Sequence, residues 1–94
     1  MQGQGRRHRG RLLTVVVSAG TGGASRFGLA VSRKVGNAVT RNRVKRWLRE
    51  AVRALAETFP PHVDAVLIAQ PAAAGADLRL ITHELASLMS RLSR

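Results

Sequence analysis

The sequence contains no cysteine, and this absence excludes two classes of site. Neither a disulfide framework nor a thiolate metal site can form, and a chain without cysteine suits a reducing compartment. No apolar run approaches the roughly 18 residues that a membrane-spanning helix needs. The apolar residues 12–19 are too few and too strand-like for a secretory signal. We therefore expect a cytoplasmic protein that has no membrane partner.

Acidic and aromatic residues are scarce as well. The 94 residues include five Asp and Glu and only 3% aromatic residues, with no Tyr. The carboxylates are scattered, and His8, His62 and His83 do not have the spacing of a zinc site. No glycine-rich segment ends in the GK[ST] sequence of a phosphate-binding loop. The sequence therefore predicts no catalytic residue, no metal site on the protein and no small-molecule substrate.

Basic charge is present in excess. There are 16 Lys and Arg, of which 14 are Arg, and the formal net charge is +11. Thirteen of the 16 lie in residues 1–53 beside one acidic residue, whereas residues 54–94 hold three basic and four acidic residues. Guanidinium groups are always charged and pair with phosphate through two hydrogen bonds. A nucleic-acid partner explains this pattern better than a basic surface kept for solubility.

Hydrophobic periodicity predicts an α+β domain. The helical pattern follows a cap at Asn37 or Thr40, runs to about Thr58, and resumes after Asp77. Three segments have the composition of strands, namely residues 11–19, 25–33 and 63–69. The order β-β-α-β-α predicts a single small domain with a mixed sheet over residues 11–94. Residues 1–10 are rich in Gly and Arg and are expected to form a flexible basic arm.

The second predicted strand has two unlike faces. Alternation directs one set of side chains to the core and a set of small side chains the other way. The core set is Phe27, Leu29 and Val31, and the small set is Gly28, Ala30 and Ser32. Small residues allow either another backbone or a packed helix to approach the sheet closely. The pattern alone leaves both interpretations open.

The first predicted helix carries an apolar stripe and a basic ridge. The stripe includes Val44, Leu48 and Trp47, so Trp47 is expected to anchor the helix in the core rather than to stack on a base. On the opposite side Arg41, Lys45 and Arg49 recur every four residues. The residues beside this ridge are Asn42, Arg43, Arg46 and Arg53, and Arg33 and Lys34 precede the helix. Repulsion within such a ridge is relieved by a phosphate backbone, although a merely solvated charged face is the alternative.

The segment FGLAVSRKVGNAVTRNRVKRWLREAVR, residues 27–53, closely resembles the signature of the bacterial ribonuclease P protein component. The Arg-Asn-Arg triplet and the Gly-Leu-x-Val-Ser lead-in carry this resemblance. It implies a left-handed βαβ crossover and a ribosomal-protein-S5-domain-2-like fold. It also implies a subunit that binds a catalytic RNA and promotes removal of the 5′ leader of precursor tRNA. In that family the RNA, with bound Mg²⁺, performs the hydrolysis, so the chain itself is expected to be non-catalytic and to hold no Mg²⁺ site of its own.

The resemblance assigns roles to residues by position. The RNA-binding set is Arg33, Lys34, Arg41, Asn42, Arg43, Lys45, Arg46, Arg49 and Arg53. The small residues Gly28, Ala30 and Ser32 would face a cleft for the single-stranded leader. Relatives usually line this cleft with aromatic residues and with a basic N-terminal helix that carries a Phe. Here the first residues are rich in Gly, Gln and Arg and Phe27 points to the core, so leader binding is expected to depend more on charge.

Three other classes of function fit the sequence less well. A different basic RNA-binding module, for example a ribosome-associated protein, would share the charge but not the signature. A DNA-binding regulator would place its helix in the major groove and read base edges. A self-sufficient nuclease would need a cluster of carboxylates for metal, and the sequence does not offer one.

Overall fold

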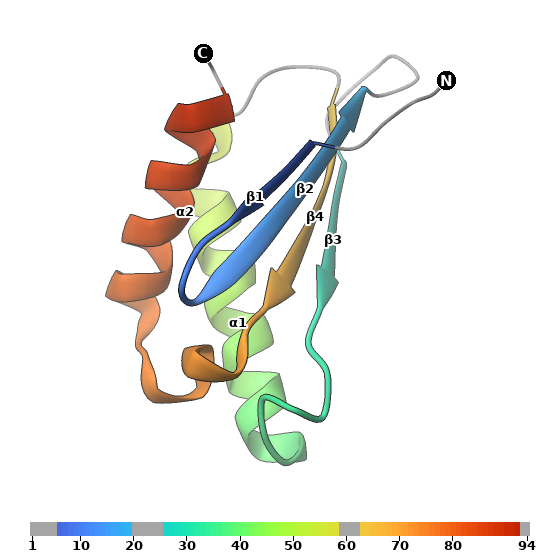
Figure 1. Ribbon diagram of the computed structural model, residues 1–94. Coiled ribbons are helices and arrows are strands. Elements are labelled where there is room, and N and C mark those ends of the chain that lie inside the picture. The colour runs from blue at the N-terminus through green and yellow to red at the C-terminus, as the bar shows by residue number, and fades with distance from the viewer. Residues whose placement is uncertain (1–5, 20–25, 59–62, 93–94) are drawn as a thin grey trace.

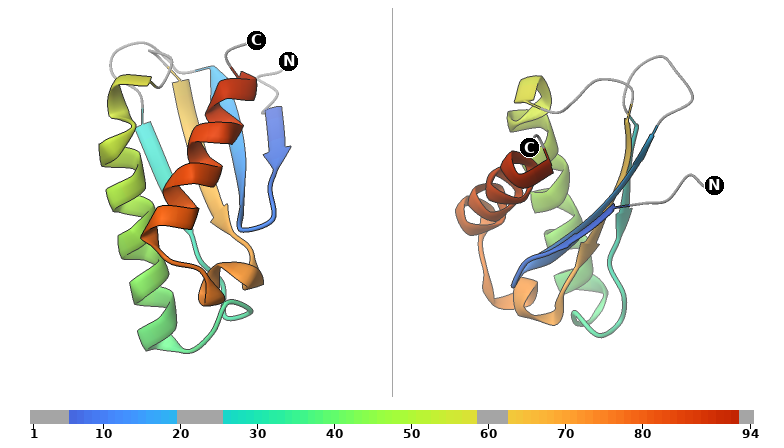
Figure 2. Two further views of the ribbon diagram at one scale, coloured as in Figure 1. Left: turned by 90° about the vertical axis from the view of Figure 1, so that its left-hand side faces the viewer. Right: turned by 45° about the horizontal axis from the view of Figure 1, so that its top comes forward.

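The computed structural model describes residues 6–19, 26–58 and 63–92. Four strands form one sheet, and two helices lie side by side on one of its faces (Figures 1 and 2). The strands are β1 (Arg6–Arg9), β2 (Leu13–Ala19), β3 (Arg26–Ala30) and β4 (Val63–Ala69). The helices are α1 (Ala38–Ala54) and α2 (Leu78–Leu92), with short 3-10 helices η1 (Ala56–Thr58) and η2 (Pro71–Gly75). The predicted α+β class is confirmed.

The sheet is mixed, as predicted. Its strand order is β1-β2-β4-β3, and β2 runs antiparallel to both of its neighbours. Strands β3 and β4 are parallel and are joined through α1 on the helix-covered face. Figure 2 shows that this crossover is left-handed, as the resemblance implied and contrary to the general right-handed rule.

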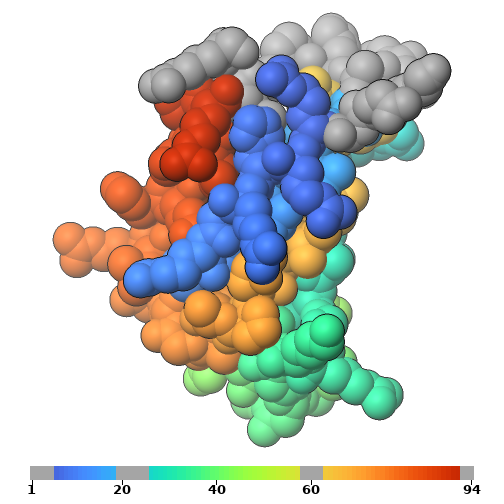
Figure 3. All heavy atoms as spheres, in the orientation of Figure 1, coloured from blue at the N-terminus to red at the C-terminus, as the bar shows by residue number. Residues whose placement is uncertain are grey.

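The predicted flexible arm is wrong for residues 6–9. These residues form β1, which pairs with β2 from Arg6 opposite Val17 to Arg9 opposite Thr14. β1 contains no apolar residue that would predict a strand, and it forms because the edge of β2 offers unpaired backbone groups. Figure 3 shows the side chains of β1 and the following turn (blue) at the surface beside α2 (orange and red). Residues 1–5 of the predicted arm lie outside the described residues.

A carboxylate on α2 holds the turn between β1 and β2. Glu84 accepts hydrogen bonds from the backbone N–H groups of Arg11, Leu12 and Leu13, at 3.2, 2.7 and 2.8 Å. The turn also contains a hydrogen bond of 2.8 Å from the Gly10 N–H to the Leu13 carbonyl. A Cβ atom on Gly10 would lie 2.5 Å from an oxygen of Glu84, so any other residue at this position would displace the carboxylate from the turn. Glu84 therefore joins the first hairpin to the last helix.

The core lies between the sheet and the two helices. Alternate residues of β2 and β4, including Leu13, Val15 and Leu67, are fully buried. α1 contributes Val44 and Leu48, and α2 contributes Ile81, Leu85 and Leu88. Burial of these side chains supplies the main stabilisation of a domain of this size. Among the described residues, neither helix is long and apolar enough to cross a bilayer.

The element boundaries follow local capping signals. Asn37 caps α1, because its side-chain oxygen accepts a hydrogen bond of 2.9 Å from the Thr40 N–H. Asp77 caps α2 in the same way, through the Leu80 N–H at 2.8 Å. α1 ends at Ala54 rather than at the expected Thr58, and η1 occupies residues 56–58 instead. The predicted strand over residues 25–33 is shorter than expected, since residues 33–35 form a turn.

Candidate nucleic-acid interface

The N-terminal end of α1 is built by a tight turn. The N–H of Val35 donates to the Ser32 carbonyl at 3.1 Å, and the N–H of Gly36 donates to the Arg33 carbonyl at 3.2 Å. Gly36 has a φ of 157°, and a Cβ atom there would lie 2.9 Å from the Thr40 side chain. Only glycine fits this position without strain. The turn presents Ser32, Arg33 and Lys34 as exposed residues where the chain enters α1.

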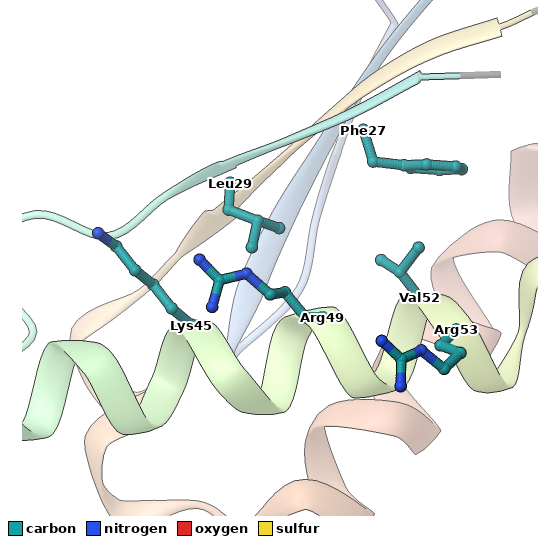
Figure 4. A pocket seen from close by; sticks show the side chains of 6 residues that line it. All are labelled: Phe27, Leu29, Lys45, Arg49, Val52 and Arg53. Atoms are coloured by element: carbon teal, nitrogen blue, oxygen red, sulfur yellow. The ribbon is translucent and has the colours of Figure 1, made fainter.

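One side of α1 faces β3 across an open groove. The groove has a volume of about 460 Å³. Its apolar lining is Phe27 and Leu29 from β3 and Val52 from α1, and its basic lining is Lys45, Arg49 and Arg53. Figure 4 shows Phe27 and Leu29 directed toward α1, and Lys45 and Arg49 rising from α1 toward β3. Three of the predicted RNA-binding residues therefore share one surface with apolar side chains.

Arg41 continues the same row one turn closer to the N-terminus of α1. The side chain of Arg41 is half-buried, and its Nε atom is buried without a hydrogen-bond partner among the described residues. A buried donor that lacks an acceptor is costly. The row Arg41, Lys45, Arg49 and Arg53 advances about 6 Å per step along the helix. Such a line of cations suits a chain of phosphates better than one compact anion.

The exposed surface of α1 continues from the groove row through Arg46 to Arg43 and Trp47. Trp47 is half-buried and packs against the core cluster, so its predicted anchoring role is confirmed, although the ring is not fully enclosed. The guanidinium carbon of Arg43 lies 5.6 Å from the centre of the Trp47 ring, which is within cation–π range. Asn42 and Arg46 are exposed. The predicted RNA-binding set of α1 thus extends from the groove around the exposed surface of the helix.

Among the described residues, the basic side chains of α1 have no acidic partners. Within residues 6–19, 26–58 and 63–92, the ion pair that forms joins Arg26 on β3 to Asp64 on β4, at 2.9 Å. The hydrogen bonds from Arg26 hold the pKa of Asp64 below its ordinary value. Asp64 therefore stays ionised and offsets Arg26, whereas the cations of α1 remain available to an external anion.

The second face of the sheet is not covered by either helix (Figure 2). Gly28 and Ala30 are exposed there, and Val66 beside them is 41% exposed. The alternative of a helix packed on these small residues is therefore wrong for the described part of the chain. Arg7 and Arg9 lie on the same face, because they pair with Val16 and Thr14 of β2. The open face combines an apolar centre with a basic rim.

Two parts of this interface do not follow from the sequence pattern. Arg7 and Arg9 could not be placed on the sheet, since nothing in their composition predicts a strand. Phe27 and Leu29 could not be placed next to the basic row, because the side of α1 that faces β3 depends on the crossover. The one feature of the sequence that indicated this position was the alternation in residues 27–31, which directs Phe27 to the core side of the sheet. In the described residues, no group of three His, Asp or Glu side chains gathers as a metal site would require.

Comparisons with known proteins identify the family of this chain. The family model described as Ribonuclease P matches residues 1–93. The ribonuclease P protein component of Brevibacillus brevis is 46% identical over 68 residues, which cover 72% of this chain and 54% of that protein. The component from Desulfovibrio desulfuricans is 45% identical over 85 residues, which cover 88% of this chain and 65% of that protein. The chain thus spans between about half and two thirds of the length of these relatives.

Solved structures share the fold. The RNase P protein from Thermotoga maritima superposes with a TM-score of 0.84 at 28% identity, covering 93% of this chain and 83% of that one. The RNase P protein of Staphylococcus aureus superposes with a TM-score of 0.82 at 26% identity, covering 94% and 81%. A family model matched over residues 1–93 and the same fold in both proteins lead to one conclusion. The chain belongs to the Ribonuclease P family, which includes the bacterial ribonuclease P protein component.

Proposed function

We propose that this chain is the protein subunit of a ribonuclease P ribonucleoprotein. It binds the catalytic RNA and the 5′ leader of precursor tRNA, and it promotes endonucleolytic removal of that leader in the cytoplasm. The observation that carries the proposal is the row of cations on α1, which form no ion pair within the described part of the chain, in a family whose members are named as ribonuclease P protein components. Cations in this arrangement neutralise phosphates, and they supply affinity without chemistry of their own.

The two basic surfaces suit different parts of the RNA. The α1 residues, with Arg33 and Lys34 at the entrance, contact the folded catalytic RNA. The open sheet face, with Gly28, Ala30 and Ser32 and the rim residues Arg7 and Arg9, receives the leader. Small side chains on that face let a nucleotide chain approach the sheet closely. Charge on the rim then provides the attraction that cleft aromatics provide in relatives.

The chemistry in this proposal belongs to the RNA. The RNA subunit would hold Mg²⁺, which would supply an activated water for phosphodiester hydrolysis, and we assign no catalytic residue to this chain. The protein holds the two RNA molecules together and screens their mutual repulsion. It therefore lowers the Mg²⁺ concentration at which the RNA folds and binds its substrate.

Reconstitution tests this function directly. We expect the chain, mixed with a bacterial ribonuclease P RNA at low Mg²⁺, to increase the rate of precursor tRNA cleavage at the mature 5′ end. A substrate without a leader should gain little affinity from the protein. Cleavage that is equally fast when the protein is omitted would contradict the proposal.

A further inference from the structure

We propose that the groove between β3 and α1 binds one unstacked nucleotide of single-stranded RNA. Its base lies against Phe27, and its flanking phosphates lie on the row of Lys45, Arg49 and Arg53. This inference rests on the proposed RNA-binding function and adds to it a defined subsite. That subsite is separate from the open face of the sheet, because Phe27 and Leu29 line the groove on the helix side (Figure 4).

The groove has the size and lining of a small-ligand site. Its volume of about 460 Å³ falls within the range of about 300–1,000 Å³ that is typical of ligand pockets. One wall is the strand β3 and the other is the helix α1, so both walls are regular elements (Figure 4). The walls are therefore preformed, and binding does not require a loop to become ordered.

The chemistry of the lining selects the ligand. Phe27, Leu29 and Val52 offer an apolar surface that is half-buried rather than sealed in the core. Lys45, Arg49 and Arg53 offer three positive charges, and no carboxylate pairs with them in the described residues. A ligand that contacts both the apolar lining and the basic lining must be anionic along one edge and must present a flat, apolar surface on another. A nucleotide has this combination, since its base presents a π-face and its phosphates carry charge.

The lining also distinguishes single-stranded from paired RNA. In a duplex the base faces are stacked, and the protein meets phosphates, 2′-hydroxyls and base edges. With such a surface the basic row can still pair with phosphates, but the apolar wall of the groove makes no favourable contact. An unpaired base can turn into the groove and cover Phe27, which the duplex cannot do.

Arg41 extends the row of charge beyond the groove. It lies one turn before Lys45 and does not line the groove, and its Nε atom is buried without an acceptor among the described residues. Arg41 therefore adds positive charge at this end of the row and does not mark a ligand site by itself. The path of the RNA runs along α1 from Arg41 toward Arg53, with the base pocket at the Phe27 end.

Fluorescence of 2-aminopurine tests the subsite. The probe is an oligoribonucleotide of about 10 nucleotides with one internal 2-aminopurine, used single-stranded and in a duplex, and titrated with the full chain. We expect the single strand to bind with a change in fluorescence, because its base leaves its neighbours and meets Phe27. Phe27→Leu keeps an apolar side chain but removes the ring, and should weaken single-strand binding by about fivefold or more. Duplex affinity should change little.

Two further variants complete the test. Arg49→Gln should weaken the binding of both the single-stranded and the duplex probe, and it should reduce the salt dependence of binding. Arg79→Gln, an exposed arginine on α2, is the matched control and should change neither quantity. The thermal midpoint of each variant shows whether it folds. If Phe27→Leu fails to fold, the exposed Arg49 carries the test through the loss of the fluorescence change. If both Phe27→Leu and Arg49→Gln bind the single strand with wild-type affinity, the proposed subsite is wrong. Binding of the catalytic RNA by the same variants would still support the proposed function. A polyglutamate peptide that competes as well as the oligonucleotide would also overturn it.

Discussion

Trp47 lies between the core and the solvent. Substitutions of Trp47 and of its neighbours in α1 allow the effect of packing on stability to be measured apart from the effect of charge on RNA binding. Its ring packs against the core cluster on one side and meets the guanidinium of Arg43 on the other. Arg46, one residue earlier, is exposed. Substitution of Arg43 would therefore disturb both packing and charge, whereas Trp47 and Arg46 each report on one of them.

We expect Trp47→Ala to lower the free energy of unfolding by about 2 kcal/mol, less than for a fully buried tryptophan, because the ring is half-exposed. The thermal midpoint would fall by roughly 10 °C, with little change in RNA affinity below the transition. Arg46→Ala should do the reverse and weaken binding of the catalytic RNA at an almost constant midpoint. Calorimetry and filter binding on both variants measure the two effects. Strong unfolding by Arg46→Ala would place this residue in the structure rather than in the interface.

At the scale of elements, β1 depends on α2 although the two are far apart in the sequence. Glu84 of α2 accepts three backbone hydrogen bonds from the turn that connects β1 to β2. Its carboxylate matches the geometry of the turn, and Gly10 leaves room for it. This contact sets the position of Arg7 and Arg9 on the open face of the sheet.

Glu84→Ala should therefore destabilise the protein by about 2–3 kcal/mol, because it leaves partly buried N–H groups without acceptors. Amide hydrogen exchange should increase first in residues 6–13, where the hairpin loses its attachment. Glu57→Ala is a suitable control, since Glu57 is exposed in η1 and should cost less than about 0.5 kcal/mol. Unchanged protection of β1 in the Glu84 variant would show that the strand is held by its pairing with β2 alone.

At the scale of the whole molecule, charge is divided between two halves. The first 53 residues, which build β1, β2, β3 and most of α1, hold 13 basic residues and one acidic residue, a net charge of +12, whereas residues 54–94 hold three basic and four acidic residues, a net charge of −1. The fold places these basic residues around α1 and the open sheet face, while α2 closes the core with almost neutral charge. An RNA partner would therefore approach from the side of α1 and β3.

Binding of the catalytic RNA should weaken steeply with salt. If about five of the cations contact phosphates, the slope of log K against log salt concentration should be roughly −4. Arg49→Gln should reduce this slope by about 0.7–0.9, and Arg79→Gln should not change it. Titrations at several salt concentrations measure the slope. A slope near zero would mean that phosphate contacts do not drive binding.

The amino-acid sequence determined the elements and the signature of this protein. Apolar periodicity predicts β2, β4 and both helices, because the side chains that must leave water recur with the period of each element. Asn37 and Asp77 mark the starts of the helices through local hydrogen bonds that a short segment can specify. The basic residues of α1 could be named for the same reason, since their spacing alone places them on the helix surface.

Tertiary structure decided what the local pattern does not contain. β1 forms without an apolar residue because the edge of β2 and the carboxylate of Glu84, more than 70 residues away, satisfy its backbone and turn. The groove of Phe27 and Arg49 exists because the left-handed crossover turns one particular side of α1 toward β3. Local sequence sets periodicity and caps, but contacts between distant segments depend on chain topology, which only the folded molecule makes visible.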